Sequence, residues 1–393
     1  MILGLLIFSL LGFFLHKNDT NLLRSEKFFI LSFLLYFLIT TLGIVLLDGE
    51  FRDLDVPSRL AIMIPIYFLL RRYRIDLSWL IWGFVIAGII FGLNITLNLF
   101  SLSLFEFTKN IGIVAFYCSI SGLISLFLIS KSNTYFINFV LLTGFVFGML
   151  GMIYMGGRGV WISNVIIVFL ILILNLKKYS VKHKISILFI VLSAFIFGIY
   201  SAPKEVHDRI AEVENVKIWI FNKDNVDVNV SDKERFIRRS GSNQYYLEES
   251  SSQRLEMWKA ALLIIKDNFI FGIGEDNYKL KKNQLIEQGV ISKYVAKFSH
   301  PHNEYLSAFV EQGVFGFLSL IGVFLVPLWI IWMEQKSESK LSLKKEFLLG
   351  YIVILHYVFY SFTSGVFDHQ NTTIFYSFIV IALISSIHKA KRI

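Results

Sequence analysis

The sequence predicts an all-α polytopic membrane protein with about eleven to twelve transmembrane helices and one large, partly helical loop. Its composition is the first reason. Of 393 residues, 55% are hydrophobic and only 17% are charged, and the mean hydropathy is +0.63, which is not the make-up of a soluble domain. The second reason is that apolar stretches of helix length recur along the chain, and one long polar insert interrupts them.

A helix that crosses a bilayer needs about twenty mostly apolar residues, and this criterion predicts about eleven spans. Their approximate limits are 1–15, 28–47, 57–70, 77–99, 109–130, 134–155, 159–176, 184–201, 304–333, 346–365 and 371–388. The first lacks the basic leader and cleavage site of a signal peptide, so it is interpreted as a span, with a mis-assigned start as the alternative. The third is short and contains Pro65, but Arg71, Arg72 and Arg74 follow it as a stop signal.

Basic residues in the short connections predict the orientation of these spans. They fall on alternate connections and therefore on one side of the membrane, which the positive-inside rule identifies as the cytoplasm. These residues are Lys17, Arg24, Lys27, Arg71, Arg72, Arg74, Lys131, Lys177, Lys178, Lys182, Lys184, Lys336, Lys340, Lys344, Lys345, Lys389, Lys391 and Arg392. The net charge of +9 is thus a topology signal, and no nucleic-acid partner is expected.

The insert divides the chain into three predicted parts. Residues 1–201 form an N-terminal transmembrane bundle of about eight spans, residues 202–303 a periplasmic loop or cap, and residues 304–393 a C-terminal set of about three spans. The first part of the insert has turn residues without periodicity, which predicts irregular structure. From Ser252 onward apolar residues recur at helical spacing, until Gly272 and Gly274 break the helix. This second part predicts an amphipathic cap lying on the membrane.

Several classes of function are disfavoured by what the sequence lacks. Its single cysteine, Cys118, lies inside a predicted span, so neither a disulfide nor a cysteine-based metal site is expected. The chain has no phosphate-binding glycine loop of the GxxxxGK[ST] or GxGxxG type, which argues against a nucleotide-driven pump.

The segment SHPHNEY, just before the long apolar run at 304–333, carries two candidate catalytic residues, His300 and His302. A neutral imidazole at a membrane rim can accept a proton near neutral pH. A metal pair is a weaker interpretation, because no cysteine or carboxylate stands at matching spacing. Asn303 and Glu304 also fit a helix start, as N-cap and first-turn acid, but capping does not explain the histidines.

Two arginines are predicted on the same outer side. Arg158 lies in MGGRGVW, where glycines on both sides let a backbone or a bulky headgroup come close; the alternative is a snorkelling interface arginine. Arg254 is expected in the first turn of the cap helix, where a cation opposes the helix dipole, which hints at an anion partner. Its alternative is an exposed arginine paired with Glu256 or Glu248.

Further candidates follow the histidine pair. Gly313 and Gly316 are expected on one face of the 304–333 helix, where small residues allow close helix packing. Glu311 and Gln312 are polar within the same helix and predict a protein interior or a wet cavity. Asp368 and His369 also face outward; a second acid or base and a simple loop turn are both compatible with them.

These residues resemble the O-antigen ligase family of membrane glycosyltransferases. The family pattern is His, then Asn, Ser or Gln, nine residues, Gly, two residues, and Gly, Thr or Tyr; His302, Asn303, residues 304–312, Gly313 and Gly316 fit it without a gap. Family arginines at the outer end of a span and at the start of a loop helix resemble Arg158 and Arg254. The stretch DVPSRLAIMIPIYFLLR, with Arg59, is also similar to early family members. About twelve spans are usual in the family, which implies a missing or unrecognised first helix here.

The resemblance implies a reaction at the periplasmic face of the bacterial inner membrane. A glycan would move from an undecaprenyl-diphosphate-linked donor to a sugar hydroxyl of a lipid A-core acceptor. His302 would take the proton from the hydroxyl, while Arg158 and Arg254 hold the diphosphate by charge-assisted hydrogen bonds. Arg59, His300, Asn303, Asp368 and His369 are possible secondary residues, and neither a metal nor a cofactor is expected.

Two other functions stay open. A polymerase of the same superfamily would use a second carrier as acceptor, but such polymerases tend to have two sizeable outer loops and this chain has one. A lipid or sugar transporter would carry out no chemistry; transporters usually have charged residues at mid-membrane, whereas the ionisable residues here lie at the rim.

Overall fold

The computed structural model describes residues 22–47, 49–72, 76–98, 100–102, 111–130, 133–174, 180–208, 210, 250–336 and 344–392. The predicted span 1–15 and most of the first part of the insert lie outside these residues. Within them the chain is helical and has no β-strand, and six helices are long and apolar enough to cross a membrane, namely α2, α4, α5, α6, α14 and α16. The predicted class, an all-α polytopic membrane protein, is confirmed.

Ten of the predicted spans appear as helices whose ends agree with the prediction to within about five residues. They are α2 (Arg24–Leu46), α3 (Asp55–Arg72), α4 (Ser78–Asn98), α5 (Ile111–Leu128), α6 (Tyr135–Tyr154), α7 (Arg158–Leu174), α8 (Val181–Tyr200), α14 (Glu304–Gln335), α15 (Lys344–Tyr360) and α16 (Gln370–Arg392). Pro65 is accommodated inside α3. Hydrophobic period and length therefore determine these helices.

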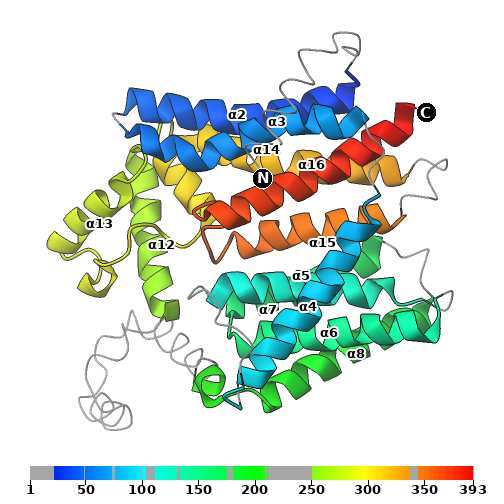
Figure 1. Cartoon of the computed structure of the whole chain (residues 1–393). Helices are drawn as coiled ribbons and strands as arrows, with labels where there is room; N and C mark the ends of the chain where they lie inside the picture. Colours follow the sequence, from blue (N-terminus) through cyan, green and yellow to red (C-terminus); the bar gives the residue numbers. More distant parts are fainter. Residues whose placement is uncertain are drawn as a thin grey trace, which may run out of the picture.

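The helices after the insert pack among those before it. α14 lies along α2, α16 along α3, and α15 contacts α5 and α7, while α4, α5 and α6 form a layer of their own (Figure 1). One core of buried apolar side chains runs through helices from both sides of the insert. The predicted boundaries at residues 201 and 303 therefore divide the sequence, but the helices on both sides of the insert pack into one core.

A buried charged network ties three helices together at one end of the bundle. Arg71 of α3 pairs with Glu26 of α2 at 3.0 Å, and both side chains are almost fully buried. The Tyr67 hydroxyl donates to Glu26 Oε1 at 3.0 Å and lies 2.8 Å from His388 Nδ1 on α16. Lys389 donates to the Arg72 carbonyl at 2.9 Å. We call this end the basic end; the predicted stop signal after α3 thus includes one arginine that is buried and paired.

The second half of the insert forms a small cap at the opposite end (Figure 1). The cap comprises α12 (Ser250–Asp267), α13 (Asn277–Glu287), a 3₁₀ turn (Lys293–Val295) and the joining loops up to Asn303. Its core contains Ala261 and Ile265 of α12, whereas Leu262 of the same helix is 59% exposed. Val310, Leu306 and Phe309 of α14 complete this core, so the cap is held by the start of α14.

α14 is broken at Gly313, where the sequence predicted one continuous helix. Gly313 has φ +66° and ψ −159°, values that glycine adopts without the steric cost of a Cβ. The break leaves backbone groups that a helix would have paired, and residues 269–274 after α12, which include the FGIG segment, pair them. Ile273 N donates to the Val310 carbonyl at 2.8 Å, Gly274 N to Glu311 at 2.9 Å, and Val314 N to Phe269 at 2.9 Å. We call this contact the cap joint.

We predict that Gly313→Ala destabilises the protein, whereas Gly322→Ala on the same helix does not. A Cβ at Gly313 would lie 2.1 Å from the Ile270 carbonyl oxygen and would require a left-handed alanine, while one at Gly322 meets nothing closer than 3.9 Å. The expected loss at Gly313 is at least about 1 kcal/mol. Thermal unfolding of both variants in the same detergent measures it, and equal midpoints would contradict the role given to the joint.

Candidate functional site

The loop that carries the two histidines is fixed from both sides by the cap. Lys282 of α13 is fully buried and donates from Nζ to the carbonyls of Val295, Ala296 and Phe298. Burial lowers the pKa of this ammonium to about 8. On the other side, Trp258 of α12 donates from Nε1 to the Pro301 carbonyl at 3.0 Å. The Lys282 anchor could not be predicted from the sequence, because a lysine on a polar helix is ordinarily solvated.

His302 stands on strained backbone at the start of α14. Its φ is +51°, a left-handed value that is uncommon for any residue other than glycine. Directly after it, Asn303 caps the helix, its Oδ1 accepting from Leu306 N at 3.1 Å as the sequence suggested. Glu304 is buried and accepts from Phe367 N at 3.0 Å, while its own N–H donates to the Ser361 carbonyl. The helix start is thereby tied to the loop between α15 and α16.

The same α15–α16 loop reaches His300. Asp368 Oδ2 lies 3.2 Å from His300 Nδ1, and the two imidazole rings of His300 and His302 have their centroids 4.2 Å apart. His300 and Asp368 are each about one-third exposed. His369 contributes its carbonyl to the first turn of α16, where Thr372 and Thr373 donate to it. Of the two residues proposed as a second acid or base, Asp368 thus contacts the histidine pair.

Arg254 lies close enough to both Arg158 and His302 for their charges to interact. Burial lowers the pKa of the Arg254 guanidinium; the nearby Tyr360 hydroxyl opposes this shift, and the positive charge of Arg158 adds to it. Burial also lowers the pKa of His302 from 6.5 to about 4, and His300, Arg254 and His369 add to that shift in this order. α12 therefore brings Arg254 near the histidine loop, and the start of α7 brings Arg158 near Arg254.

Two details of the arginines differ from the sequence interpretation. α12 begins at Ser250, so Arg254 stands one turn deeper than the first turn. Glu256, one of its suggested partners, instead accepts from Ser292 N at 3.3 Å, and among the described residues no carboxylate pairs with Arg254.

The glycines beside Arg158 also serve the protein's own packing. A Cβ at Gly159 would overlap the Thr363 side chain at 2.0 Å, and one at Gly157 would lie 2.9 Å from Ala115 Cβ. Gly156 has φ +67°, which turns the chain between α6 and α7. The close approach that these glycines permit is therefore to neighbouring helices and to the α15–α16 loop, and it brings the start of α7 up to that loop.

Arg59 belongs to a neighbouring polar cluster. It pairs with Asp55 at 2.6 Å, and Gln370 donates to the same carboxylate at 3.0 Å. The Arg59 side chain is only 13% exposed, and its Nη1 has no hydrogen-bond partner. The α15–α16 region therefore contacts both clusters, through Gln370 at Asp55 and through Asp368 at His300.

An acidic cluster at the cap joint was only partly foreseen. Gln312 is buried and donates to Glu275 Oε2 at 3.4 Å, while its own Oε1 has no partner. Burial raises the pKa of Glu275 to about 7, and the Asp53 carboxylate adds to the shift. The sequence predicted that Glu311 and Gln312 face a protein interior or a wet cavity. It did not predict Glu275, which comes close to them because its segment pairs with α14 at the Gly313 break. Among the described residues, no three side chains of metal-ligating type converge.

The comparisons with known proteins place this geometry in context. Residues 143–321 match a protein-family model described as O-antigen ligase, and this segment includes Arg158, Arg254, His302, Gly313 and Gly316. The chain is also similar to an uncharacterized protein of Haemophilus influenzae (strain Rd). The two are 25% identical over 368 residues, which cover 92% of this chain and 86% of the relative.

We predict that Glu275→Gln stabilises the protein at alkaline pH only. The wild-type carboxyl group has a pKa of about 7 in the fold and 4.5 unfolded, so the folded state holds its proton more tightly, and stability falls as pH rises from about 4.5 through 7. Glutamine cannot ionise and removes this dependence. Unfolding midpoints at pH 5 and pH 8.5 should differ less in the variant, whose advantage at pH 8.5 amounts to about 1 to 3 kcal/mol. An unchanged pH profile would contradict the buried position of Glu275.

Proposed function

We propose that this protein, whose residues 143–321 match the O-antigen ligase family model, is a membrane glycosyltransferase that attaches a preassembled glycan to lipid A-core. The donor is the glycan on undecaprenyl diphosphate, and the acceptor is a sugar hydroxyl of the core. The reaction takes place at the periplasmic face of the bacterial inner membrane, where the cap faces outward. No nucleotide sugar is present there, so the donor must bring its own leaving group.

One observation carries this proposal: the Arg254 guanidinium, which pairs with no carboxylate among the described residues, lies within interacting distance of Arg158 and of the neutral imidazole of His302. Two like charges in a partly buried setting repel each other and lose hydration, so they favour an anion between them. A diphosphate carries enough negative charge to offset both. Planar guanidinium groups bind its oxygens through paired hydrogen bonds.

The chemistry follows from these roles. The acceptor oxygen attacks the anomeric carbon of the donor sugar, and the bond from that carbon to the diphosphate oxygen breaks. The bonding electrons leave with the diphosphate, whose growing charge Arg158 and Arg254 stabilise. The proton of the attacking hydroxyl goes to His302.

The pKa of His302 suits a base that acts only when donor is bound. At about 4 it keeps the ring neutral at physiological pH, so the nitrogen is free to accept a proton, although such a ring is a weak base. A diphosphate bound beside it adds negative charge, which favours the protonated ring and raises its pKa. Donor binding thus strengthens the base in the complex that needs it.

A polymerase of the same superfamily is the second candidate, because it would use the same donor site with a carrier-linked glycan as acceptor. A gel of lipopolysaccharide from a deletion strain tests the choice. Loss of a ligase leaves a bare core and long glycans on the carrier, whereas loss of a polymerase leaves core bearing one repeat unit. An unaltered lipopolysaccharide would contradict both activities.

We predict that His302→Gln abolishes transfer and leaves carrier binding unchanged, because the amide cannot take the proton. A loss of roughly a hundredfold or more in kcat is expected. Purified variant and wild type are compared for transfer rate and for binding of undecaprenyl diphosphate, with His207→Gln, an exposed histidine before the cap, as control. If His302→Gln transfers glycan at the wild-type rate, His302 is not the general base. If the protein is a transporter, neither the wild type nor any variant transfers glycan.

We also predict that Arg254→Lys loses transfer and weakens carrier binding, although the charge is kept. A lysine is a point charge and cannot reproduce the planar pair of hydrogen bonds, so about tenfold or more is lost in Kd. Lys266→Ala, in the exposed last turn of the same helix, is the matched control. Carrier affinity that survives in Arg254→Lys, Arg254→Ala and Arg158→Ala alike would contradict the proposed diphosphate site.

A third prediction concerns pH. The acid limb of kcat/KM reports the free enzyme and should fall well below 6.5, the ordinary pKa of histidine, because the ring of His302 resists protonation down to about 4. The acid limb of kcat reports the donor complex and should lie at higher pH. Rates measured from pH 3.5 to 8 separate the two limbs, and an acid limb of kcat/KM at or above 6.5 would contradict the assignment.

A further inference from the structure

A long apolar groove runs along the outer face of the bundle between α2 and α14. Three cavities of about 500, 360 and 720 Å³ follow one another along these helices. Neighbouring cavities share lining residues: Ile39 and Phe315 line the first two, and Phe28 and Val326 line the last two. The three cavities are thus sections of one groove, which we call the α2–α14 groove.

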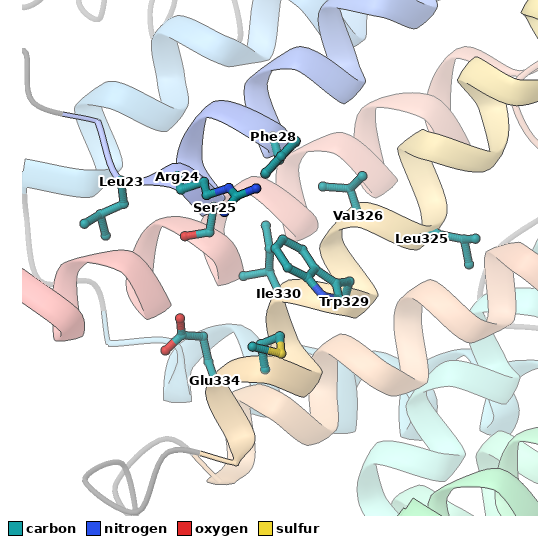
Figure 2. A pocket seen from close by; sticks show the side chains of 10 residues that line it. Leu23, Arg24, Ser25, Phe28, Leu325, Val326, Trp329, Ile330 and Glu334 are labelled. Atoms are coloured by element: carbon teal, nitrogen blue, oxygen red, sulfur yellow. The ribbon is translucent and has the colours of Figure 1, made fainter.

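Small side chains form the floor of the groove and large apolar ones its rims. Ser32 and Ser319 are nearly buried beneath it, and Gly322 faces Ser32 with 3.9 Å between its Cβ position and Ser32 Cβ. Phe315, Leu318 and Trp329 stand at the rim and are 41–57% exposed. Figure 2 shows the section at the basic end, with Phe28 of α2 and Trp329 of α14 lining the same space. Such a surface accommodates a linear hydrocarbon chain.

The length of the groove decides between two kinds of chain. From Phe28 to Leu46 it follows α2 for about 27 Å, at 1.5 Å per residue. This is close to the full hydrocarbon thickness of a bilayer, about 30 Å. An acyl chain of an ordinary phospholipid or of lipid A reaches only to the bilayer midplane, about 15 Å. A polyprenyl chain can occupy the groove through both leaflets.

The groove leads toward the candidate site. At the cap end its walls are Phe271 and Gln312, which belong to the cap joint. From there the first part of α14, Glu304–Gln312, extends about 14 Å to the histidine loop. The cap end of the groove is therefore about this far from the histidine loop. We propose that the α2–α14 groove seats the polyprenyl chain of the lipid-linked donor, an inference that rests on the proposed function.

Filling the groove at one point tests this. Gly322→Leu places an isobutyl group in the middle section, where a Cβ meets no clash, and Gly83→Leu on α4, with no atom within 4 Å of its Cβ position, is the matched control. With a full-length undecaprenyl donor, Gly322→Leu should raise KM about tenfold or more, whereas a donor analogue with a two-unit prenyl chain should react equally with both variants and wild type. Loss with both donors, or with neither, overturns the proposal.

A second measurement does not depend on turnover. A full-length donor with a photoreactive diazirine at the far end of its chain should label wild-type peptides around Phe28 or Trp329, and Gly322→Leu should lose this label. Labelling on α4 or α6, or labelling that excess phospholipid removes entirely, overturns the proposal. If wild type transfers glycan and neither the Gly322→Leu substitution nor the donor's chain length affects transfer or labelling as expected, only the groove assignment fails. If wild type transfers nothing from any donor, the proposed function itself fails.

Discussion

The arrangement of the cap and the histidine loop depends on one constraint: a broken helix near a membrane must have its backbone groups paired. At Gly313 the α14 ladder stops, and the FGIG segment of the cap pairs the freed groups through main-chain hydrogen bonds. A side chain at Gly313 or at Gly272 would overlap the other segment, so glycine is needed on both sides of the joint. The cap is therefore fixed to the bundle by backbone contacts, and α12 carries Arg254 to a fixed place.

The candidate site combines groups that would not gather for stability alone. Two arginines close to one another carry a cost, and so does His302, which has a partly buried imidazole on left-handed backbone. The surrounding contacts hold them there: Lys282 and Trp258 fix the loop from the cap, and Glu304 fixes it from α14. This grouping of two arginines and His302 favours the binding of a negatively charged substrate.

The membrane helices could be predicted from the sequence because hydrophobic length alone determines them. The joint at Gly313 could not, since a glycine in an apolar run has the same sequence signal whether it packs a helix or ends one. The approach of Arg158 to Arg254 depends on a contact between Gly159 and Thr363 that no local pattern reveals. Asp368 and Glu275 were likewise invisible as partners, because each meets its neighbour across more than thirty residues of sequence. The catalytic roles themselves came from the motif and remain a proposal.

The buried network at the basic end has a mechanical consequence for α2. There the helix is clamped by a carboxylate and a guanidinium that are both shielded from water, and separating them would leave a charge stranded in the protein. At its other end, the exposed ion pair from Arg52 to Asp276 adds little to hold the adjoining turn to the cap. A substitution that removes either partner of the buried pair would therefore weaken the packing of α2 against α3 at the end of the bundle that lies away from the cap.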